Sequence, residues 1–469
     1  MFVKQLYTGC LSEAAYYIES DGEAAIIDPL RDTAAYISLA KERNAVIKYI
    51  FETHFHADFV SGHLELNQKT GAPIVYGPGT ETSFEAYVAK DGEQFNIGNL
   101  TLEVLHTPGH TLESSCYLLK DQQDKPYCVF TGDTLFVGDV GRPDLSSGSL
   151  TSNELAGMLY DSLNKKIKPL KDEVLVYPAH GPGSACGKNL GPDTYSTIGD
   201  EKKSNYALQA ANKEEFIKAV TEGLIEPPVY FYINAKINKE GYDVLDQILK
   251  QGMNALPAEE FNLAIKDNED IIVLDTRNAS VFTQGFVPGS VFIGLDGRYA
   301  EWAGSLLPYD KDLLLVTEPG KEEESIIRLA RVGLDKVKGY LQGGYAAWKS
   351  AGLPIDMIID IEADELAMDL PYDDHLVVVD VRKETEFADG HVKGAFNLPL
   401  GDMKDPGTMS QLEETDNIYV HCAGGYRSVI AASLLKRQGF NNLRNVLGGW
   451  GKIKQEKGIE VVKEKSVLN

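Results

Sequence analysis

The sequence predicts a multidomain α/β protein, and three observations support this fold class. The chain has 469 residues, which at roughly 100–200 residues per domain corresponds to about two to four domains. Short apolar runs typical of strands alternate along the chain with stretches of helical spacing. In the second half, a set of residues recurs at a fixed offset, and the repeating unit is long enough to be a duplicated domain.

Charge and cysteine content exclude several classes of protein. The net charge is −25 and the isoelectric point is near 4.8, which argues against nucleic acid and anionic membranes as partners. The five cysteines are widely spaced, odd in number and form no CxxC pair, a pattern of reducing compartments. No apolar run is long enough to span a membrane, and the N-terminus lacks the apolar segment of a signal peptide. We therefore expect a cytoplasmic protein.

The first fifty residues predict a strand hairpin followed by a helix. Residues 14–18 and 24–29 are apolar and read as strands, and the Asp21-Gly22 pair between them is a typical hairpin turn. Residues 33–48 show helical spacing.

A polar stretch with two histidines follows the next apolar run, residues 46–51. Within it, His54, His56 and Asp58 can direct two imidazoles and a carboxylate into one cavity. These ligand types favour Zn or Fe over Ca or Mg. The alternative is a pair of ordinary core or surface histidines with satisfied hydrogen bonds. The stretch alone leaves both interpretations open.

Three later strands favour the metal site. The apolar runs 100–105, 127–130 and 174–177 each lead into a polar segment, and these segments contain His110, Asp133 and His180. Because side chains at the ends of adjacent strands converge, we expect one sheet edge to build a metal centre. Residues 73–77 read as another strand, and a helix begins within residues 61–66.

These ordered motifs resemble the metallo-β-lactamase fold, with spacing similar to its glyoxalase II and persulfide dioxygenase branches. The resemblance implies an αββα sandwich over residues 1–252, with the site along one edge. Residues 205–252 look helical and close this domain, apart from an interruption at residues 227–232.

One position departs from the dinuclear members of that fold, which carry a histidine directly after the first aspartate. Here that residue is Phe59, which cannot bind metal. By the resemblance, His54, His110 and Asp133 then hold one metal, a set similar to the facial triad of non-haem iron oxygenases. Persulfide dioxygenases use the corresponding residues, so the implied cofactor is one Fe(II) per chain.

The resemblance gives His56, Asp58 and His180 a supporting role, orienting ligands through hydrogen bonds. It also places Arg142 near the site. Arg142 either forms an ion pair that holds its loop or contacts an anionic thiol substrate, and we favour the first role. Cys186 falls in a loop expected at the pocket mouth, where it could contact substrate, although most cysteines in such loops are incidental.

The repeat in the second half has an offset of 105 positions (380 − 275). Asp275 and Arg277 match Asp380 and Arg382, and paired glycines follow in both units. Each unit alternates strands and helices, which predicts a small parallel sheet. The pattern resembles the rhodanese family, and the units correspond to domains at residues 256–355 and 360–469.

The second unit carries the features of a sulfur-transfer site. An apolar strand leads into Cys422, a glycine-bearing loop follows, and residues 429–437 read as a helix. Backbone N–H groups and a helix N-terminus favour the thiolate and bind anions. Arg427 adds a charged fork for sulfite or thiosulfate. The residues expected to contact substrate are Gly424, Gly425, Tyr426 and Arg427.

The first unit lacks a cysteine at the matching position. Cys422 falls opposite Thr317 or Glu318, depending on a one-residue slip. Neither residue can carry a persulfide, so this unit is predicted to be inactive. It would serve as a spacer, a dimer surface or a cover for a pocket.

The order of domains resembles the persulfide dioxygenase–rhodanese fusions. The resemblance implies oxidation of a low-molecular-weight persulfide by O₂ to sulfite and thiol at Fe(II), and transfer of sulfane sulfur through Cys422. Whether thiosulfate is formed or used stays open, as do the thiol carrier, channelling between sites, and assembly as a homo-oligomer. The alternatives are a glyoxalase II-like thioester hydrolase with an appended sulfurtransferase, and a non-enzymatic sulfur-carrier or interaction scaffold.

Overall fold

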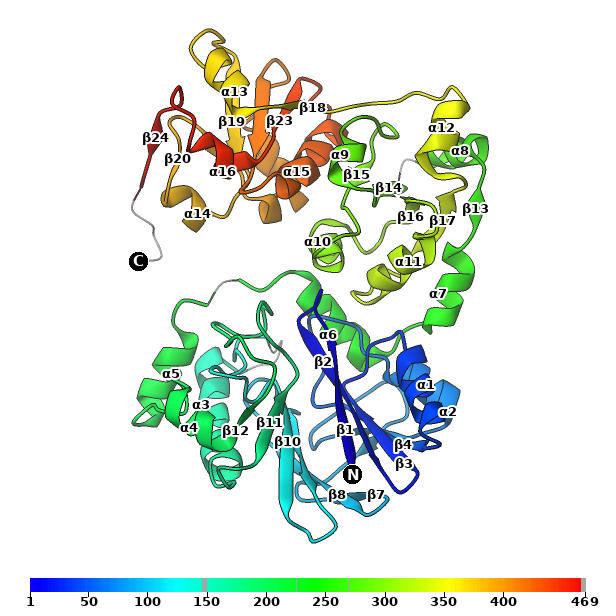
Figure 1. The fold of residues 1–469 in the computed structure, drawn as a ribbon, viewed down its shortest axis with the longest axis vertical. Helices are drawn as coiled ribbons and strands as arrows, with labels where there is room; N and C mark the ends of the chain where they lie inside the picture. The colour runs from blue at the N-terminus through cyan, green and yellow to red at the C-terminus, as the bar shows by residue number, and fades with distance from the viewer. Residues whose placement is uncertain (146–149, 225, 269, 465–469) are drawn as a thin grey trace. The chain divides into compact units, whose positions relative to one another are not determined.

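The computed structural model describes residues 1–145, 150–224, 226–268 and 270–464, and its contacts divide the chain into two compact units (Figure 1). The first unit comprises Met1–Gln247 with Ala330–Gly333, and the second comprises Ile248–Leu329 with Leu334–Asn469. The predicted fold class is confirmed: one unit is an αββα sandwich, and the other contains two parallel α/β domains.

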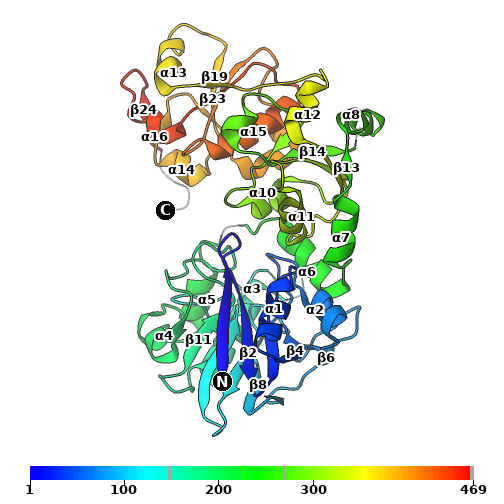
Figure 2. The ribbon, with the colours of Figure 1, turned by 45° about the vertical axis from the view of Figure 1, so that its right-hand side comes forward.

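Two six-stranded sheets form the first unit (Figure 2). The first sheet has the order β1-β2-β3-β4-β5-β6 and the second has the order β12-β11-β10-β9-β8-β7. The strands of the first sheet are β1 (Phe2–Thr8), β2 (Glu13–Ser20), β3 (Glu23–Ile27), β4 (Val46–Phe51), β5 (Ile74–Tyr76) and β6 (Tyr87–Val88). Those of the second are β7 (Gln94–Ile97), β8 (Leu100–His106), β9 (Ser115–Lys120), β10 (Pro126–Gly132), β11 (Leu175–Pro178) and β12 (Ser196–Thr197).

Helices cover the outer faces of both sheets. They are α1 (Ala34–Glu42), α2 (His63–Thr70), α3 (Ser152–Ser162) with the π-helical turn η1 (Leu163–Ile167), α4 (Ile198–Ser204) and α5 (Lys213–Thr221). A further helix, α6 (Tyr230–Glu240), lies against the loop after β4, where Asn238 donates to the carbonyls of His56 and Phe59 at 2.8 Å. A seventh, α7 (Leu245–Gly252), contains the division between the units.

The core of the first unit has three layers. Phe51 and Phe130 belong to a cluster enclosed between the two sheets. Leu66 of α2 packs in the cluster on the outer face of the first sheet, and Leu159 and Phe216 pack in the cluster on the outer face of the second. Burying an apolar side chain of this size contributes about 1.5–3 kcal/mol, so each helix is held by its apolar face.

The N-terminal hairpin is confirmed, but the extent of the first helix is not. Asp21 and Gly22 connect β2 and β3, both with positive φ, the conformation that a tight hairpin turn requires. The helix predicted over residues 33–48 ends at Glu42. Asn44 takes a left-handed conformation with φ of 57°, which stops the helix and lets β4 begin at Val46.

The interruption predicted at residues 227–232 is also partly wrong, because α6 begins at Tyr230. The aromatic residues of this stretch therefore form the first turn of a helix, with Tyr230 and Phe231 buried.

The second unit contains two five-stranded sheets of the same topology. Their orders are β13-β17-β16-β14-β15 and β18-β23-β22-β19-β21, and every pairing in both sheets is parallel, as the repeat predicted. The strands are β13 (Ala255–Leu256), β14 (Ile272–Asp275), β15 (Val291–Phe292), β16 (Leu313–Val316), β17 (Val337–Leu341), β18 (Ile359–Ile361), β19 (Leu376–Asp380), β21 (Phe396–Asn397), β22 (Asn417–His421) and β23 (Leu443–Val446). A separate antiparallel pair joins β20 (His391–Val392) and β24 (Val461–Val462).

The helices of the second unit flank these sheets. Those of the first rhodanese-like domain are α8 (Ala258–Asp267), α9 (Ala279–Phe282), α10 (Tyr299–Leu306), α11 (Glu322–Ala330) and α12 (Gly344–Ser350). Those of the second are α13 (Ala363–Asp369), α14 (Glu384–Ala388), the 3₁₀ turns η2 (Leu400–Lys404) and η3 (Pro406–Met409), α15 (Tyr426–Arg437) and α16 (Gly449–Ile453).

Candidate functional site

The polar segments that the sequence singled out come from both sheets of the first unit. His54 follows β4 of the first sheet, whereas His110, Asp133 and His180 follow β8, β10 and β11 of the second. The expectation of a single sheet edge is therefore wrong. Because the two sheets pack face to face, their loops meet along a shared edge of the sandwich.

His54, His110 and Asp133 form a buried cluster. Their ligand atoms all lie within 4.8 Å of one another, and Asp133 Oδ2 is 3.8 Å from His54 Nε2 and 3.5 Å from His110 Nε2. Neither carboxylate oxygen of Asp133 has a hydrogen-bond partner among the described residues. A buried carboxylate without hydrogen bonds is costly, so this set of two imidazoles and one carboxylate fits a divalent metal ion.

Hydrogen bonds on the far side of each ring fix both imidazoles. His110 Nδ1 donates to the Arg142 carbonyl at 2.9 Å. His54 Nδ1 donates to Thr53 Oγ1 at 2.9 Å, and the Thr53 hydroxyl donates in turn to Asp28 Oδ2 at 2.9 Å. Both rings therefore present Nε2 to Asp133, the arrangement by which outer hydrogen bonds orient metal-binding histidines.

Electrostatics favours the neutral, metal-binding form of His54. Burial, together with the nearby rings of His56, His110 and His180, holds the pKa of His54 well below its ordinary value. A neutral imidazole keeps the Nε2 lone pair that a metal requires.

The residues expected to support the cluster lie beside it. His180 Nε2 is 3.5 Å from Asp58 Oδ2 and also 3.5 Å from Asp133 Oδ1. His56 Nε2 is 3.1 Å from Asp28 Oδ1. Burial opposes protonation of His56, but the carboxylates of Asp28 and Glu52 raise its pKa well above the usual range. His56, Asp58 and His180 also form a second group with ligand atoms within 4.8 Å.

Phe59 occupies the position where dinuclear relatives carry a histidine. Its side chain is fully buried, and its ring centroid lies 4.4 Å from that of His56. The group of His56, Asp58 and His180 therefore has the apolar ring of Phe59 beside it and not a further metal ligand.

Two residues at this site were underrated or missed by the sequence analysis. Cys186 is buried and forms a ligand group with Asp133 and His180; burial raises the pKa of its thiol well above the ordinary value. Asp28 fixes both Thr53 and His56. The only sequence signals were the proximity of Cys186 to His180 and the place of Asp28 at the end of a strand.

Arg142 forms an ion pair within its own loop, and its contact with substrate stays a prediction. Arg142 Nε and Nη2 each donate to the Asp144 carboxylate at 2.7 Å, and Nη1 donates to the Ala185 carbonyl at 3.3 Å. The backbone N–H of Arg142 donates to the Cys186 carbonyl at 3.1 Å. This network fixes the carbonyl that accepts from His110.

In the second unit, Cys422 lies in the loop between β22 and α15. The Gly425 backbone N–H donates to Cys422 Sγ at 3.1 Å, and Ser428 Oγ lies 3.7 Å from the sulfur. Gly425 is the N-cap of α15, with φ of 107°, so the helix N-terminus is next to the sulfur. Both the N–H group and the helix dipole favour negative charge there.

Other residues of this loop are engaged away from the sulfur. Arg427 forms a two-pronged ion pair with Glu386, at 2.8 and 2.9 Å, so its fork is already occupied by a carboxylate. The Tyr426 hydroxyl donates to the Gly294 carbonyl of the first rhodanese-like domain at 3.0 Å. At Gly424, no atom lies within 4 Å of the position that a β-carbon would take. The predicted substrate contacts of these residues stay predictions.

The strand register settles which residue replaces the cysteine in the first repeat. Val316 is opposite Asp275 in one sheet, and His421 is opposite Asp380 in the other. The residue after each of these strands is therefore Thr317 in the first repeat and Cys422 in the second. Thr317 cannot form a persulfide.

Comparison with known proteins defines the class of each part of the chain. The model of the metallo-beta-lactamase superfamily matches residues 8–180, and the model of the rhodanese-like domain matches residues 257–351 and 362–456. Within the described residues, no helix has the length and apolar character needed to cross a membrane.

Three similar proteins extend this comparison. A metallo-beta-lactamase structure from Staphylococcus aureus is 33% identical, with 73% of this chain and 99% of that chain covered, and has a TM-score of 0.64. The structure of ETHE1 from Myxococcus xanthus is 30% identical, with 51% and 98% of the two chains covered and a TM-score of 0.44. A probable hydroxyacylglutathione hydrolase of Schizosaccharomyces pombe is 31% identical over 180 residues, which is 37% of this chain and 66% of that protein. The chain belongs to the metallo-beta-lactamase superfamily and carries two rhodanese-like domains behind that domain.

Proposed function

We propose that the first unit is a persulfide dioxygenase with one Fe(II) per chain, and that the second unit transfers sulfane sulfur through Cys422. The observation that carries the first part is the buried set of His54, His110 and Asp133, together with Phe59, which lies against His56 where a histidine would supply a ligand for a second metal. Two imidazoles and one carboxylate leave coordination positions open, as in non-haem iron oxygenases.

In the proposed reaction, a persulfide RSSH reacts with O₂ and water to give RSH, sulfite and two protons. The terminal sulfur gives up four electrons, and O₂ accepts them. Bound Fe(II) supplies the redox chemistry of this step. The chain supplies the geometry: the Arg142 carbonyl and the Thr53 hydroxyl fix the rings of His110 and His54.

The proposed sulfur transfer uses the Cys422 thiolate as the nucleophile. Attack on thiosulfate forms an S–S bond at Cys422 and breaks the S–S bond of thiosulfate, which releases sulfite. The reverse reaction forms thiosulfate from sulfite and the enzyme persulfide. The Gly425 N–H, 3.1 Å from Cys422 Sγ, stabilises negative charge on the thiolate and, after transfer, on the outer sulfur of the enzyme persulfide.

Metal analysis of protein purified without oxygen tests the first part, combined with O₂ uptake and sulfite formation on glutathione persulfide. We expect about one iron per chain and persulfide-dependent O₂ uptake. Zinc without O₂ uptake would contradict the proposal. Cys422→Ser tests the second part: O₂ uptake should persist while sulfur transfer between thiosulfate and a thiol is lost. Loss of both activities would argue against two separate centres.

A glyoxalase II-like thioester hydrolase with an appended sulfurtransferase is the second candidate. Two observations favour it: one of the similar proteins is a probable hydroxyacylglutathione hydrolase, and His180 with Asp58 stands beside Asp133 as a second group of ligands. Metal-assisted hydrolysis would use a metal-bound hydroxide. Hydrolysis of an acyl-glutathione in the absence of O₂ would favour this candidate over the dioxygenase.

A further inference from the structure

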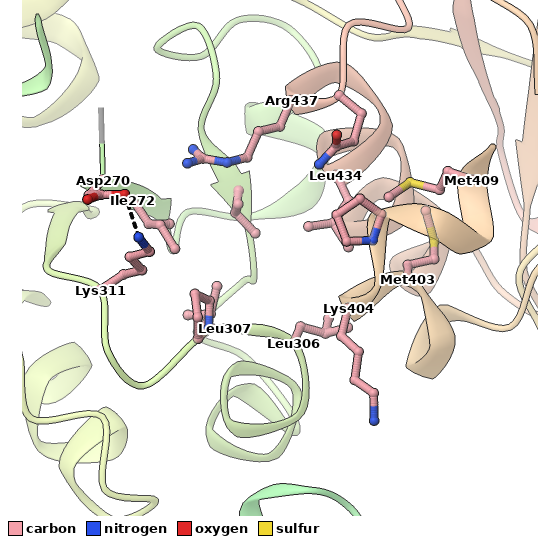
Figure 3. A pocket seen from close by; sticks show the side chains of 14 residues that line it. Asp270, Ile272, Leu306, Leu307, Lys311, Met403, Lys404, Met409, Leu434 and Arg437 are labelled. Carbon is pink, nitrogen blue, oxygen red and sulfur yellow. Dashed lines mark hydrogen bonds and ion pairs between the residues drawn. The ribbon is translucent and has the colours of Figure 1, made fainter. Parts of the chain in front are cut away.

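The two rhodanese-like domains enclose a pocket that belongs to neither proposed site (Figure 3). Its volume is about 210 Å³. One wall comes from the first domain, from β15 and the segment after α10. The other comes from η2, η3 and the C-terminal half of α15.

The walls of the pocket are mainly apolar. Val291 and Leu307 line it from the first domain, and Met403, Met409 and Leu434 line it from the second. The first four of these side chains are at most 5% exposed. The two methionines are suited to irregular apolar groups, because their side chains are flexible and polarizable. The pocket therefore offers an apolar interior for a short hydrocarbon or aromatic group.

The polar lining is predominantly cationic. Lys311 forms an ion pair with Asp270, which is the only carboxylate among the described lining residues. Arg437 Nη1 donates to the Gly289 carbonyl at 2.9 Å. Neither Arg437 nor Lys404 forms an ion pair with another of the described residues. In Figure 3, Arg437 and Lys311 extend from opposite domains toward the same side of the pocket.

This local excess of positive charge contrasts with the whole chain, whose 70 acidic residues outnumber its 45 basic ones. A hydrogen bond from a cationic side chain on the pocket wall to an anionic ligand is stronger than one to a neutral ligand. An arginine fork can also donate two N–H groups to the two oxygens of a carboxylate, or to two of the three oxygens of a sulfonate.

We propose that this pocket binds a small amphipathic organic anion, with its carboxylate or sulfonate at Arg437 and its apolar body against Met403 and Met409. The occupant would contact both rhodanese-like domains at once. The proposal does not depend on the activity of the metal centre or of Cys422.

Hexanoate is a suitable probe because it combines one carboxylate with a short apolar chain. In full-length protein labelled with ¹³C-methyl methionine, hexanoate should shift the signals of Met403 and Met409 saturably and leave the other five of the seven methionines unmoved. Met403→Leu and Met409→Leu assign the two signals. Hexan-1-ol, which has the same chain without the charge, should bind at least tenfold more weakly. Shifts spread over all methionines, or no saturation at millimolar hexanoate, would overturn the proposal.

Two variants and one control complete the test by calorimetry. Arg437→Gln should weaken hexanoate binding at least tenfold, because it removes the charge that faces the carboxylate. Leu434→Trp should abolish binding by filling the pocket with a side chain from α15. Arg444→Gln is the matched control: it removes an arginine of the same domain that does not line the pocket, and it should bind hexanoate as the wild type does. Equal affinity of Arg437→Gln and the wild type would overturn the assignment of the anion to Arg437.

Discussion

Gly425 and Gly424 are adjacent in the Cys422 loop, but only one of them is conformationally constrained. Gly425 has φ of 107° and donates its N–H to Cys422 Sγ at 3.1 Å. Gly424 has no positive φ, and no atom lies within 4 Å of the place that a β-carbon would take there. The pair therefore separates the effect of backbone conformation from the effect of an added methyl group.

Gly425→Ala should impair sulfur transfer selectively. Holding an L-residue at this φ costs about 1–3 kcal/mol, and rotation to relieve the strain moves the N–H away from the sulfur. A hydrogen bond to a charged group contributes about 1.5–3 kcal/mol, so its loss in the transition state corresponds to about a tenfold to hundredfold lower kcat/KM. The added methyl group is not itself obstructed, since the nearest atom, Gly448 N, lies 3.6 Å away.

The assay is thiosulfate-to-thiol sulfur transfer under steady-state conditions, with persulfide-dependent O₂ uptake measured on the same preparations. Gly424→Ala should stay within about twofold of the wild type, because nothing restricts a methyl group there. Equal losses in the two variants would refute the role assigned to the Gly425 N–H. A loss of O₂ uptake in Gly425→Ala would point instead to general unfolding.

Three further predictions concern the metal centre and the domain contact. Asp144→Asn should weaken metal binding about 10–100-fold, because it breaks the ion pair that fixes Arg142, whose carbonyl accepts from His110. Asp161→Asn, which breaks an exposed ion pair, is the control. Metal competition titrations measure the affinity of both variants. Phe59→His should raise the total content of bound metal (iron plus zinc) from about one toward two per chain by elemental analysis, whereas Phe59→Leu should not. Tyr426→Phe should destabilise the second unit by about 1 kcal/mol, since the Gly294 carbonyl loses its donor; an unchanged urea midpoint would contradict this.

Much of the fold was predictable because apolar runs and turn residues act locally. The Asp21-Gly22 turn and strands β8, β10 and β11 follow the sequence pattern closely. The pattern failed where two periodicities overlap: the helical spacing after Thr33 continues into β4, and only the left-handed backbone at Asn44 separates the two. That conformation depends on the structure around it and cannot be read from spacing.

The site was predictable as a set of residues, but its hydrogen bonds were not. Histidine and aspartate at strand ends indicate a metal site whatever their ring orientation. Which nitrogen of each ring faces Asp133 depends on hydrogen bonds that spacing does not reveal, such as those to the Arg142 carbonyl for His110 and to the Thr53–Asp28 pair for His54. The position of Cys186 beside Asp133 likewise depends on how the loop after β11 folds back.

The duplicated domains show which part of a sequence motif reports fold and which part reports chemistry. In the first repeat, Arg277 Nη2 donates to Asp275 at 2.7 Å and to the Gly285 carbonyl at 2.8 Å. In the second, Arg382 Nη2 donates to Asp380 at 2.5 Å and to the Gly390 carbonyl at 2.7 Å. An aromatic ring lies against the guanidinium in both.

This shared ion pair is present in a domain that has no cysteine to carry sulfur. It therefore belongs to the architecture: a buried aspartate at the end of a central strand is paired with an arginine that fixes the following loop, and breaking such a pair costs about 3–5 kcal/mol. The proposed chemistry depends instead on the loop after the neighbouring strand, where the first repeat has Thr317 and the second has Cys422. A match to the rhodanese-like family over both repeats thus assigns the fold twice, whereas the residue in that loop restricts the proposed sulfur transfer to one domain.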